Sequence, residues 1–110
     1  MRQITKILNQ ANQKFKFAVP GYDSVEITLQ FKPNQDAWFI SLVWGSFQVL
    51  NDRVVNSLNL LRQYKNMIPF GILIYHPDRL DPFSLEAWTS GFEFYMLDSA
   101  DIALTEAYYV

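Results

Sequence analysis

The chain has 110 residues, of which half are apolar and 18% are charged, and its formal net charge is −2. This composition fits one folded domain. The lack of cysteine and the single histidine exclude disulfide scaffolds, thiol nucleophiles and multi-histidine zinc sites. Residues 1–20 lack the apolar core of a signal peptide, because Lys14 and Lys16 interrupt it, and no run reaches membrane-spanning length. We therefore expect a soluble protein made in the cytoplasm.

Two segments in the first third of the chain alternate apolar and polar residues, a pattern that predicts half-buried strands. In residues 14–19, Phe15 and Phe17 alternate with lysines, and a Pro-Gly turn signal follows. Residues 24–32 show the pattern most clearly. Their apolar face consists of Val25, Ile27, Leu29 and Phe31, and their polar face of Ser24, Glu26, Thr28, Gln30 and Lys32.

Residues 37–50 predict a β-hairpin, because Gly45-Ser46 separates two apolar runs and favours a type II′ turn. The predicted cross-strand pairs are Trp44 with Phe47, Leu42 with Val49, and Ile40 with Asn51. One face then carries Trp38, Ile40, Leu42, Trp44, Phe47 and Val49. The other face is also apolar, since it carries Phe39, Val43 and Leu50 beside Ser41 and Gln48. Either this second face belongs to the protein's own core, or another chain covers it.

The second half of the chain gives weaker signals. Residues 51–67 are the most helix-like stretch, with Leu58, Leu61 and Tyr64 on one short face that Asn56, Ser57 and Asn59 weaken. The segments 71–76 and 91–97 predict strands. Residues 82–90, after the cap signal Asp81-Pro82, form either one short helix or an irregular crossover, and residues 99–107 predict a last turn of helix. Together these elements predict an all-β or β-rich fold, a small antiparallel barrel of five to six strands with one or two short helices.

The histidine lies in the tripeptide His76-Pro77-Asp78, which is also the signature of J-domain co-chaperones. In a J-domain this tripeptide joins two long helices, the first of them basic. Here Pro69, Gly71 and a β-type run precede it, so no such helix can form. A strand that ends in a turn explains the same letters, and we interpret the tripeptide as a coincidence.

No motif in the chain indicates catalysis. Asp78, Asp81, Glu86 and Glu93 cluster in sequence and could include a carboxylate pair, but turn caps and solvated charges account for them. The four glycines are scattered, so there is no phosphate-binding loop, and no nucleophile elbow surrounds a serine. We expect no enzymatic activity and predict no catalytic, metal-binding or cofactor-binding residues.

The alternative function is a small OB-type module that binds single-stranded nucleic acid. Such a module needs basic residues beside stacking aromatics, and the candidates are Lys14, Lys16 and Lys32 near Phe15, Phe17 and Phe31. On a strand, however, Lys14 and Lys16 face away from Phe15 and Phe17. The acidic balance of the chain also disfavours a phosphate backbone as partner.

The pieces "NQKFKFAV", "VEITLQF", "WFISLVWGSFQVL", "NSLNLLRQY", "GILIYH" and "GFEFYML" follow one another over residues 1–98. Their order resembles the family of small phage baseplate plug proteins, the OB-like plug domains of contractile-tailed particles. The most specific part is the central hairpin with its connector of Leu60, Leu61 and Tyr64. Two features depart from the family. Its members carry an Asp-Gly type turn in place of Gly45-Ser46, and many of them end soon after the last strand.

This resemblance implies an OB-like fold and a non-enzymatic, structural role in the tail baseplate of a virion, after synthesis in the host cytoplasm. Such a plug contacts hub, spike and tail-tube proteins, in several copies around the tail axis. The chain is then one domain, 1–110, with 98–110 as a C-terminal extension. The candidate partner contacts are Phe39, Val43 and Leu50 on the hairpin and Tyr108, Tyr109 and Val110 at the C-terminus. For both sets, burial within the protein itself is the alternative.

Overall fold

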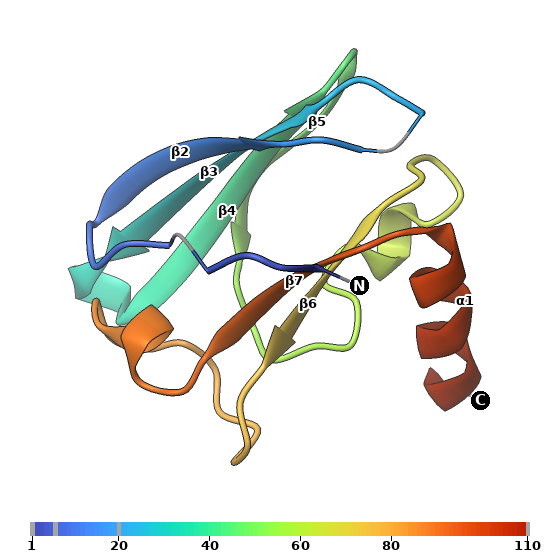
Figure 1. Cartoon of the computed structure of the whole chain (residues 1–110). Helices are drawn as coiled ribbons and strands as arrows, with labels where there is room; N and C mark the ends of the chain where they lie inside the picture. Colours follow the sequence, from blue (N-terminus) through green and yellow to red (C-terminus); the bar gives the residue numbers. More distant parts are fainter. Residues whose placement is uncertain (1, 6, 20, 110) are drawn as a thin grey trace.

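The computed structural model describes residues 2–5, 7–19 and 21–109, which form seven strands, one α-helix and four 3₁₀ turns (Figure 1). The strands are β1 (Arg2–Gln3), β2 (Asn12–Phe17), β3 (Val25–Lys32), β4 (Ala37–Trp44), β5 (Phe47–Arg53), β6 (Gly71–Tyr75) and β7 (Glu93–Leu97). The helix is α1 (Ser99–Glu106), and the turns are η1 (Pro33–Gln35), η2 (Arg62–Tyr64), η3 (Ala87–Thr89) and η4 (Ala107–Tyr109). The predicted β-rich fold is confirmed, with seven described strands instead of five or six.

The four-stranded sheet joins β2, β3, β4 and β5 in chain order, and every pair in it is antiparallel. The alternation predicted for β3 is confirmed, since Val25, Ile27 and Leu29 are fully buried. Successive side chains on a strand point to opposite faces, so the polar residues between them lie on the outer face of the sheet. One face of this sheet therefore belongs to the core and the other faces outward.

The β4–β5 hairpin follows the predicted register near its turn and departs from it further away. Leu42 pairs with Val49, and Trp44 pairs with Phe47. Gly45 has a φ of 61°, a left-handed conformation that glycine adopts without strain. The predicted pair of Ile40 with Asn51 is wrong, because a bulge shifts Ile40 to Asp52. Asn51 takes a φ of 56° in this bulge, and its N–H donates to the Ser41 hydroxyl at 3.0 Å.

The three-stranded sheet has the order β1-β7-β6, and the chain after β5 extends it along β6. Ser57 forms an antiparallel bridge with Ile74, and the Leu60 N–H donates to the Ile72 carbonyl at 2.6 Å. The helix predicted within 51–67 is therefore wrong, because β5 continues to Arg53 and only the single 3₁₀ turn η2 forms after it. Backbone pairing with β6 competes with helix formation in this segment, whose Asn and Ser residues are weak helix formers.

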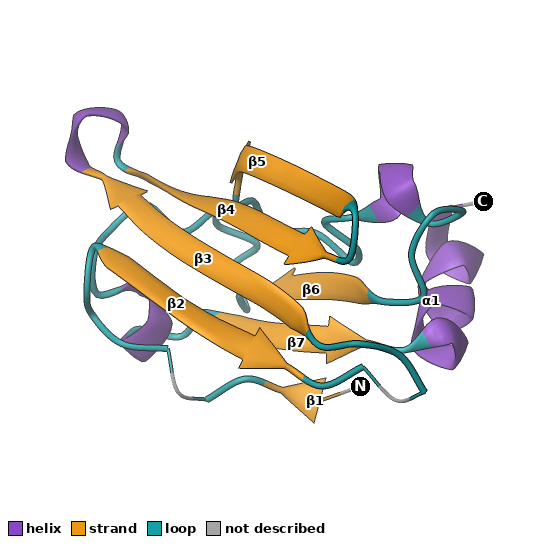
Figure 2. Ribbon diagram, turned by 90° about the horizontal axis from the view of Figure 1, so that it is seen from above, coloured by secondary structure: helices purple, strands orange, loops and turns teal. Residues whose placement is uncertain are grey.

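The two sheets form two layers with the core between them (Figure 2). The largest fully buried side chains are Trp38, Phe70, Phe94, Ile27, Leu29, Ile40, Leu42, Leu61, Ile72, Ile74, Val25 and Val54. Burial of each such side chain stabilises the fold by roughly 1.5–3 kcal/mol relative to leaving it exposed. No closed barrel is detected among the described strands, which stay in two sheets.

The segment between β6 and β7 is an irregular crossover with the turn η3 rather than a helix. Its Ser84 carbonyl accepts the ring N–H of buried Trp38 at 2.8 Å, which fixes the crossover to β4. The predicted cap Asp81 instead accepts the N–H of Asn56 at 2.8 Å. The predicted C-terminal helix forms as α1, where Asp98 and Asp101 make a capping box at its first turn.

Candidate interaction surfaces

The outer face of the four-stranded sheet combines basic and apolar side chains. Cross-strand register places these residues on one side of the sheet. We name this surface the basic sheet face, and it comprises Lys14, Lys16, Glu26, Lys32, Phe39, Val43, Leu50 and Arg53. It holds four basic residues and one acidic residue, although the whole chain has a net charge of −2. The positive charge of this face is thus a local feature.

The apolar side chains of the hairpin lie exposed or partly exposed on this face. Val43 is 41% exposed and Leu50 is 63% exposed, whereas Leu42, the neighbour of Val43 on β4, is 1% exposed. Phe39 is half-buried, and the Lys32 ammonium lies 4.4 Å from the centre of its ring. The helix α1 lies at one end of the molecule and leaves this face open (Figure 1). The second face of the hairpin is therefore not part of the protein's own core.

A groove lies on the opposite side of the molecule, beside the outer face of β6. It has a volume of about 670 Å³ and is lined by Asn56, Ser57, Leu58, Leu73, Ile74, Tyr75, Arg79 and Tyr108. Tyr108, in η4, is 78% exposed and forms one wall. Of the other predicted C-terminal contacts, the side chain of Tyr109 and the residue Val110 lie outside the described part of the chain. The structure thus separates Tyr108 from the hairpin residues.

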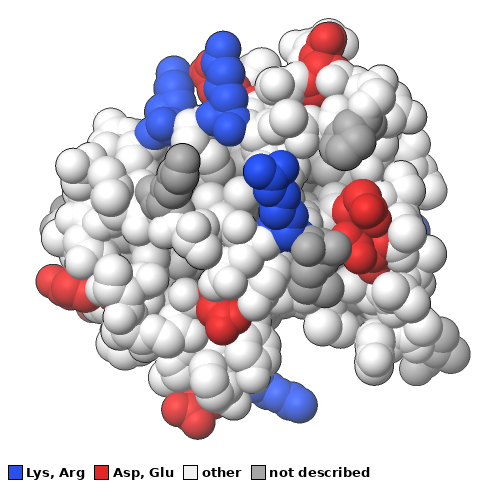
Figure 3. Space-filling view, in the orientation of Figure 1, with Lys and Arg blue, Asp and Glu red and all other residues white. Residues whose placement is uncertain are grey.

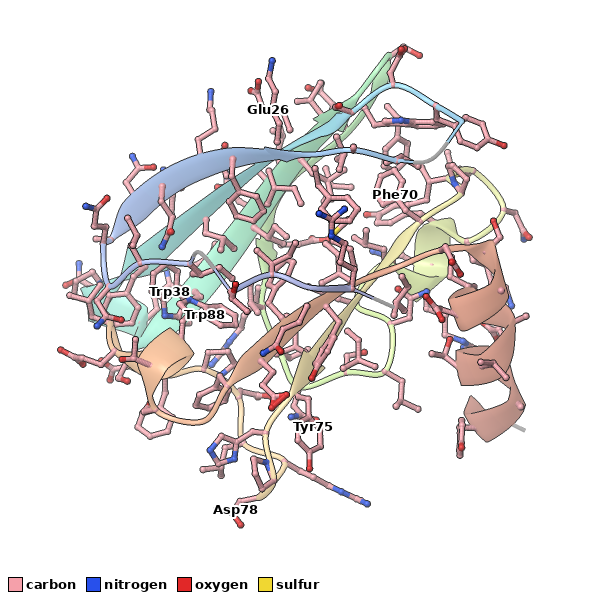
Figure 4. The ribbon with its side chains drawn as sticks, in the orientation of Figure 1. Glu26, Trp38, Phe70, Tyr75, Asp78 and Trp88 are labelled. Carbon is pink, nitrogen blue, oxygen red and sulfur yellow. The ribbon has the colours of Figure 1, made fainter. Side chains whose placement is uncertain are left out.

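The one charged residue that lines this groove is Arg79, and three carboxylates lie next to lining residues, outside the lining itself. Asp78 follows β6 in the turn to the crossover, Asp81 binds the backbone of the groove residue Asn56, and Glu93 pairs with Tyr75 in the sheet register. We name the groove and these three carboxylates the acidic groove face. Glu26 points to the top of Figure 4, and Tyr75 and Asp78 lie at the bottom of it. In the space-filling view, basic side chains project at the top beside acidic ones, and the lower edge carries acidic side chains and one basic side chain (Figure 3).

Glu93 also interacts with its neighbour Tyr95 on β7. The Tyr95 hydroxyl donates to the Glu93 carboxylate at 2.5 Å. This hydrogen bond raises the pKa of the Tyr95 hydroxyl, and burial and the carboxylate charge act in the same direction. Tyr95 therefore stays protonated at neutral pH and acts as a hydrogen-bond donor on this face.

The histidine of the His-Pro-Asp tripeptide has a structural role. Its ring lies against Phe92, with 4.4 Å between ring centres, and its Nδ1 atom accepts the N–H of Asp78 at 3.1 Å. The His76 carbonyl accepts the N–H of Arg79 at 2.9 Å, which closes a turn after β6. The interpretation of the tripeptide as a strand that ends in a turn is confirmed, because it follows β6 and does not join two long helices.

A smaller cleft opens between the two sheets at the end where α1 begins. It has a volume of about 310 Å³, and its lining includes Phe17, Tyr22, Phe70 and Met96. Arg2 covers part of it, with its guanidinium carbon 5.3 Å from the centre of the Phe17 ring. The inward packing of Phe15 and Phe17 confirms that these rings lie on the other side of β2 from the lysines.

Sequence reasoning identified one of the two surfaces more fully than the other. It brought Phe39, Val43 and Leu50 together on one face, and their contact with a partner stays a prediction. It missed the groove, because Leu58 was assigned to a helical face. The alternation in β6 already placed Leu73 and Tyr75 on the outer side of that strand, and this was the available signal.

Comparison with known proteins adds no family assignment. No protein-family model matches the chain, and no curated protein matches it. Among the described residues, no three His, Cys, Asp or Glu side chains lie close enough together to hold a metal ion. Nor does any described helix combine the length and the apolar character needed to cross a membrane.

Proposed function

We propose that this protein is a non-enzymatic structural component of a contractile phage tail baseplate, where it plugs or bridges the central hub, spike and tail-tube region. The observation that carries the proposal is the basic sheet face, on which Val43 and Leu50 remain exposed. Exposed apolar side chains grouped on one face are typical of surfaces that another protein covers. The resemblance of the sequence pattern to baseplate plug proteins supplies the kind of assembly.

The chain path supports an OB-like, barrel-related description of the fold. At one edge, residue Val54 continues the pairing of β5 by donating to the Trp38 carbonyl at 2.8 Å, and Ser57 then pairs with β6. At the other edge, the chain passes from β1 in the three-stranded sheet to β2 in the four-stranded sheet. The two layers are thus joined by the chain at both edges, as in a partly open barrel.

The separation of the two surfaces supports a bridging role. The basic sheet face and the acidic groove face point in opposite directions and belong to different sheets (Figure 4). A protein that only fills space needs one complementary surface, whereas a bridge needs two. The two-layer core between them gives a rigid spacer.

Mass spectrometry of purified virions, with amine-reactive cross-linking, tests the proposal. We expect the chain at low copy number, cross-linked to hub, spike or tube proteins through Lys14, Lys16 or Lys32 on the basic sheet face. Absence of the chain from particles, together with abundance in infected cells, would contradict a virion role.

A double variant tests the surface directly. Phe39→Ser with Val43→Ser should keep the circular dichroism of the isolated protein and block its incorporation into particles. As a matched control, Thr28→Ala and Gln48→Ala change polar residues of the same sheet and should be incorporated normally. Incorporation of the Phe39 and Val43 variant at the normal level would show that this face contacts nothing in the baseplate.

Single-stranded nucleic-acid binding is the second candidate, and one observation favours it. Lys14, Lys16, Lys32 and Arg53 share a sheet face with the aromatic ring of Phe39, as the binding sheets of OB-type modules do. This candidate predicts salt-sensitive binding of a single-stranded oligonucleotide. No binding at low ionic strength would remove it.

A further inference from the structure

The two outer faces of the molecule are opposite in charge. The basic sheet face carries four basic residues and one acidic residue, and the acidic groove face carries Asp78, Asp81 and Glu93 next to a groove whose one charged lining residue is Arg79. If basic and acidic residues were scattered evenly over both faces, neither face would carry a net charge. Here the four basic residues lie on the four-stranded sheet, whereas Glu93 lies on β7 and Asp78 and Asp81 follow β6, and Glu26 and Asp78 mark opposite ends of the molecule in Figure 4.

Each of these faces also exposes apolar side chains. On the basic sheet face these are Val43 and Leu50, at 41% and 63% exposure. On the acidic groove face they are Leu58, Tyr75 and Tyr108, at 40%, 46% and 78% exposure. An apolar centre with charged residues around it is the usual anatomy of a protein–protein interface.

We propose that copies of this chain associate head to tail, with the basic sheet face of one copy on the acidic groove face of the next. The groove volume of about 670 Å³ leaves room for protruding side chains such as Leu50 of the neighbouring copy. Opposite charges then meet across the interface, which favours encounter and fixes orientation. Pairing of two identical faces would bring like charges together and is disfavoured for the same reason.

The charges on the basic sheet face are available to a neighbour to different degrees. Lys14 is paired with Glu26 at 3.2 Å, and Lys32 lies over Phe39. Lys16 and Arg53 are exposed and form no ion pair with another described residue. These two are therefore the residues whose charge contributes most to such an interface.

The contacts on the basic sheet face favour a second copy of the chain, rather than a nucleic acid, as the partner of this face. Base stacking needs an open aromatic surface. Phe39 is half-buried, and the Lys32 ammonium occupies one side of its ring at 4.4 Å. The exposed apolar residues beside it, Val43 and Leu50, are aliphatic and give no stacking platform. The chain itself, in contrast, provides a surface of complementary charge.

The geometry of this contact determines the kind of assembly. Because the two faces are different and lie on opposite sides, the contact is heterologous, and it generates a closed ring or an open filament. This inference deepens the proposed function and rests on it for the location of the assembly at the tail axis. The contact itself is a property of the isolated chain and can be measured without phage particles.

Sedimentation velocity of the purified full chain, over a concentration series and at low and high ionic strength, tests the proposal. We expect species heavier than the 12.9 kDa monomer that dissociate as salt increases. A basic-face variant, Lys16→Glu with Arg53→Glu, and a groove-face variant, Asp78→Lys with Glu93→Lys, should each sediment as a monomer. An equimolar mixture of the two variants should restore the heavy species, because one now carries two acidic faces and the other two basic faces.

The mixing experiment also controls for folding, since two unfolded variants cannot restore a specific complex. Wild-type protein that stays monomeric at every concentration and salt level would overturn the proposal, as would folded variants that do not associate when mixed. If the wild type is monomeric and binds an oligonucleotide that the basic-face variant does not bind, the face is a nucleic-acid site and the proposal is wrong. A monomeric chain that mass spectrometry still finds in virions would leave the proposed function standing without this interface.

Discussion

The two sheets of this protein are built from contacts of different range. In the four-stranded sheet, each strand pairs with the next one along the chain, and short turns join them. In the three-stranded sheet, Arg2 of the first strand pairs with Met96 of the last strand, so that two segments far apart in sequence meet. Local pairing has a low loop-closure cost, whereas pairing of distant segments needs the rest of the fold to bring them together. The four-stranded sheet can therefore form from contacts between segments that are close in sequence, whereas the three-stranded sheet depends on the folding of the whole chain.

A single substitution in the four-stranded sheet should cause the largest loss in the free energy of unfolding. The size of this loss should depend on whether the side chain lies on the inner or the outer face of the sheet. Leu42→Ala removes a fully buried side chain from β4 and should lower the free energy of unfolding by about 2–5 kcal/mol. Its neighbour Val43 lies on the outer face, and Val43→Ala should change the free energy of unfolding by less than about 1 kcal/mol. Urea unfolding, followed by tryptophan fluorescence, measures both. Equal costs for the two variants would contradict the assignment of inner and outer faces.

The three-stranded sheet should be most sensitive at Gly71, where β6 meets the chain after β5. A Cβ at this position would lie 2.6 Å from Oδ1 of the buried Asn59. That oxygen accepts the N–H groups of Leu61 and Ile72, at 3.1 and 3.2 Å, and holds the two segments together. Gly71→Ala should therefore lower the free energy of unfolding by about 1–3 kcal/mol.

A double-mutant cycle with Asn59→Ala sharpens this prediction. If the clash with the amide is the cause, Gly71→Ala should cost much less once the amide is removed. The three atoms nearest to the added Cβ all belong to the side chain of Asn59. Additive costs would show that the glycine is needed for another reason.

The sequence predicted much of the local sheet and little of the distant one. Alternation of Val25, Ile27 and Leu29, and the glycine turn at Gly45, depend on neighbours in sequence, and both predictions were right. The helix predicted within 51–67 was wrong because β6 pairs with that segment through Ser57 and Leu60, and no local pattern encodes a partner about 15 residues away.

For the candidate surfaces too, the sequence predicted what depends on neighbouring residues and missed what depends on distant segments. Phe39 and Val43 were placed on one face because a strand has a period of two. The groove was missed because it combines Leu58, Tyr75 and Tyr108 from three distant segments. The opposite charge of the two faces could not be predicted either, since it depends on which sheet each strand joins.

Substitution in the bulge of β5 should have an intermediate effect on the free energy of unfolding. Asn51 has a left-handed φ of 56°, which a β-branched residue adopts only with strain. Asn51→Val should lower the free energy of unfolding by about 1–2 kcal/mol. Asn51→Gly keeps the conformation accessible and should be close to wild type. Thermal unfolding by circular dichroism distinguishes the two, and equal melting temperatures would argue against strain at this residue.

The smallest effect on stability is expected for a substitution at the contact between α1 and the rest of the fold. Glu106 accepts hydrogen bonds from Arg62 and forms an ion pair with Lys65 at 3.3 Å. The hydrogen bond from Arg62, together with Lys65 and against the effect of burial, lowers the pKa of the Glu106 carboxyl. A carboxylate with a lowered pKa stabilises the fold above its ordinary pKa, and this contribution is lost as the pH falls through the lowered value.

Glu106→Gln should therefore reduce the melting temperature slightly at neutral pH, and the difference from wild type should disappear in acid. The effect is small because exposed ion pairs contribute little and are screened by salt. The control Glu86→Gln changes an exposed carboxylate that forms no ion pair with a described cation, and it should leave the pH dependence unchanged. A Glu106→Gln difference that persists at low pH would show that packing of α1, rather than charge, is what this residue provides. Because α1 follows β7 directly, such a result would make the helix an integral part of the three-stranded half of the molecule rather than an appendage to it.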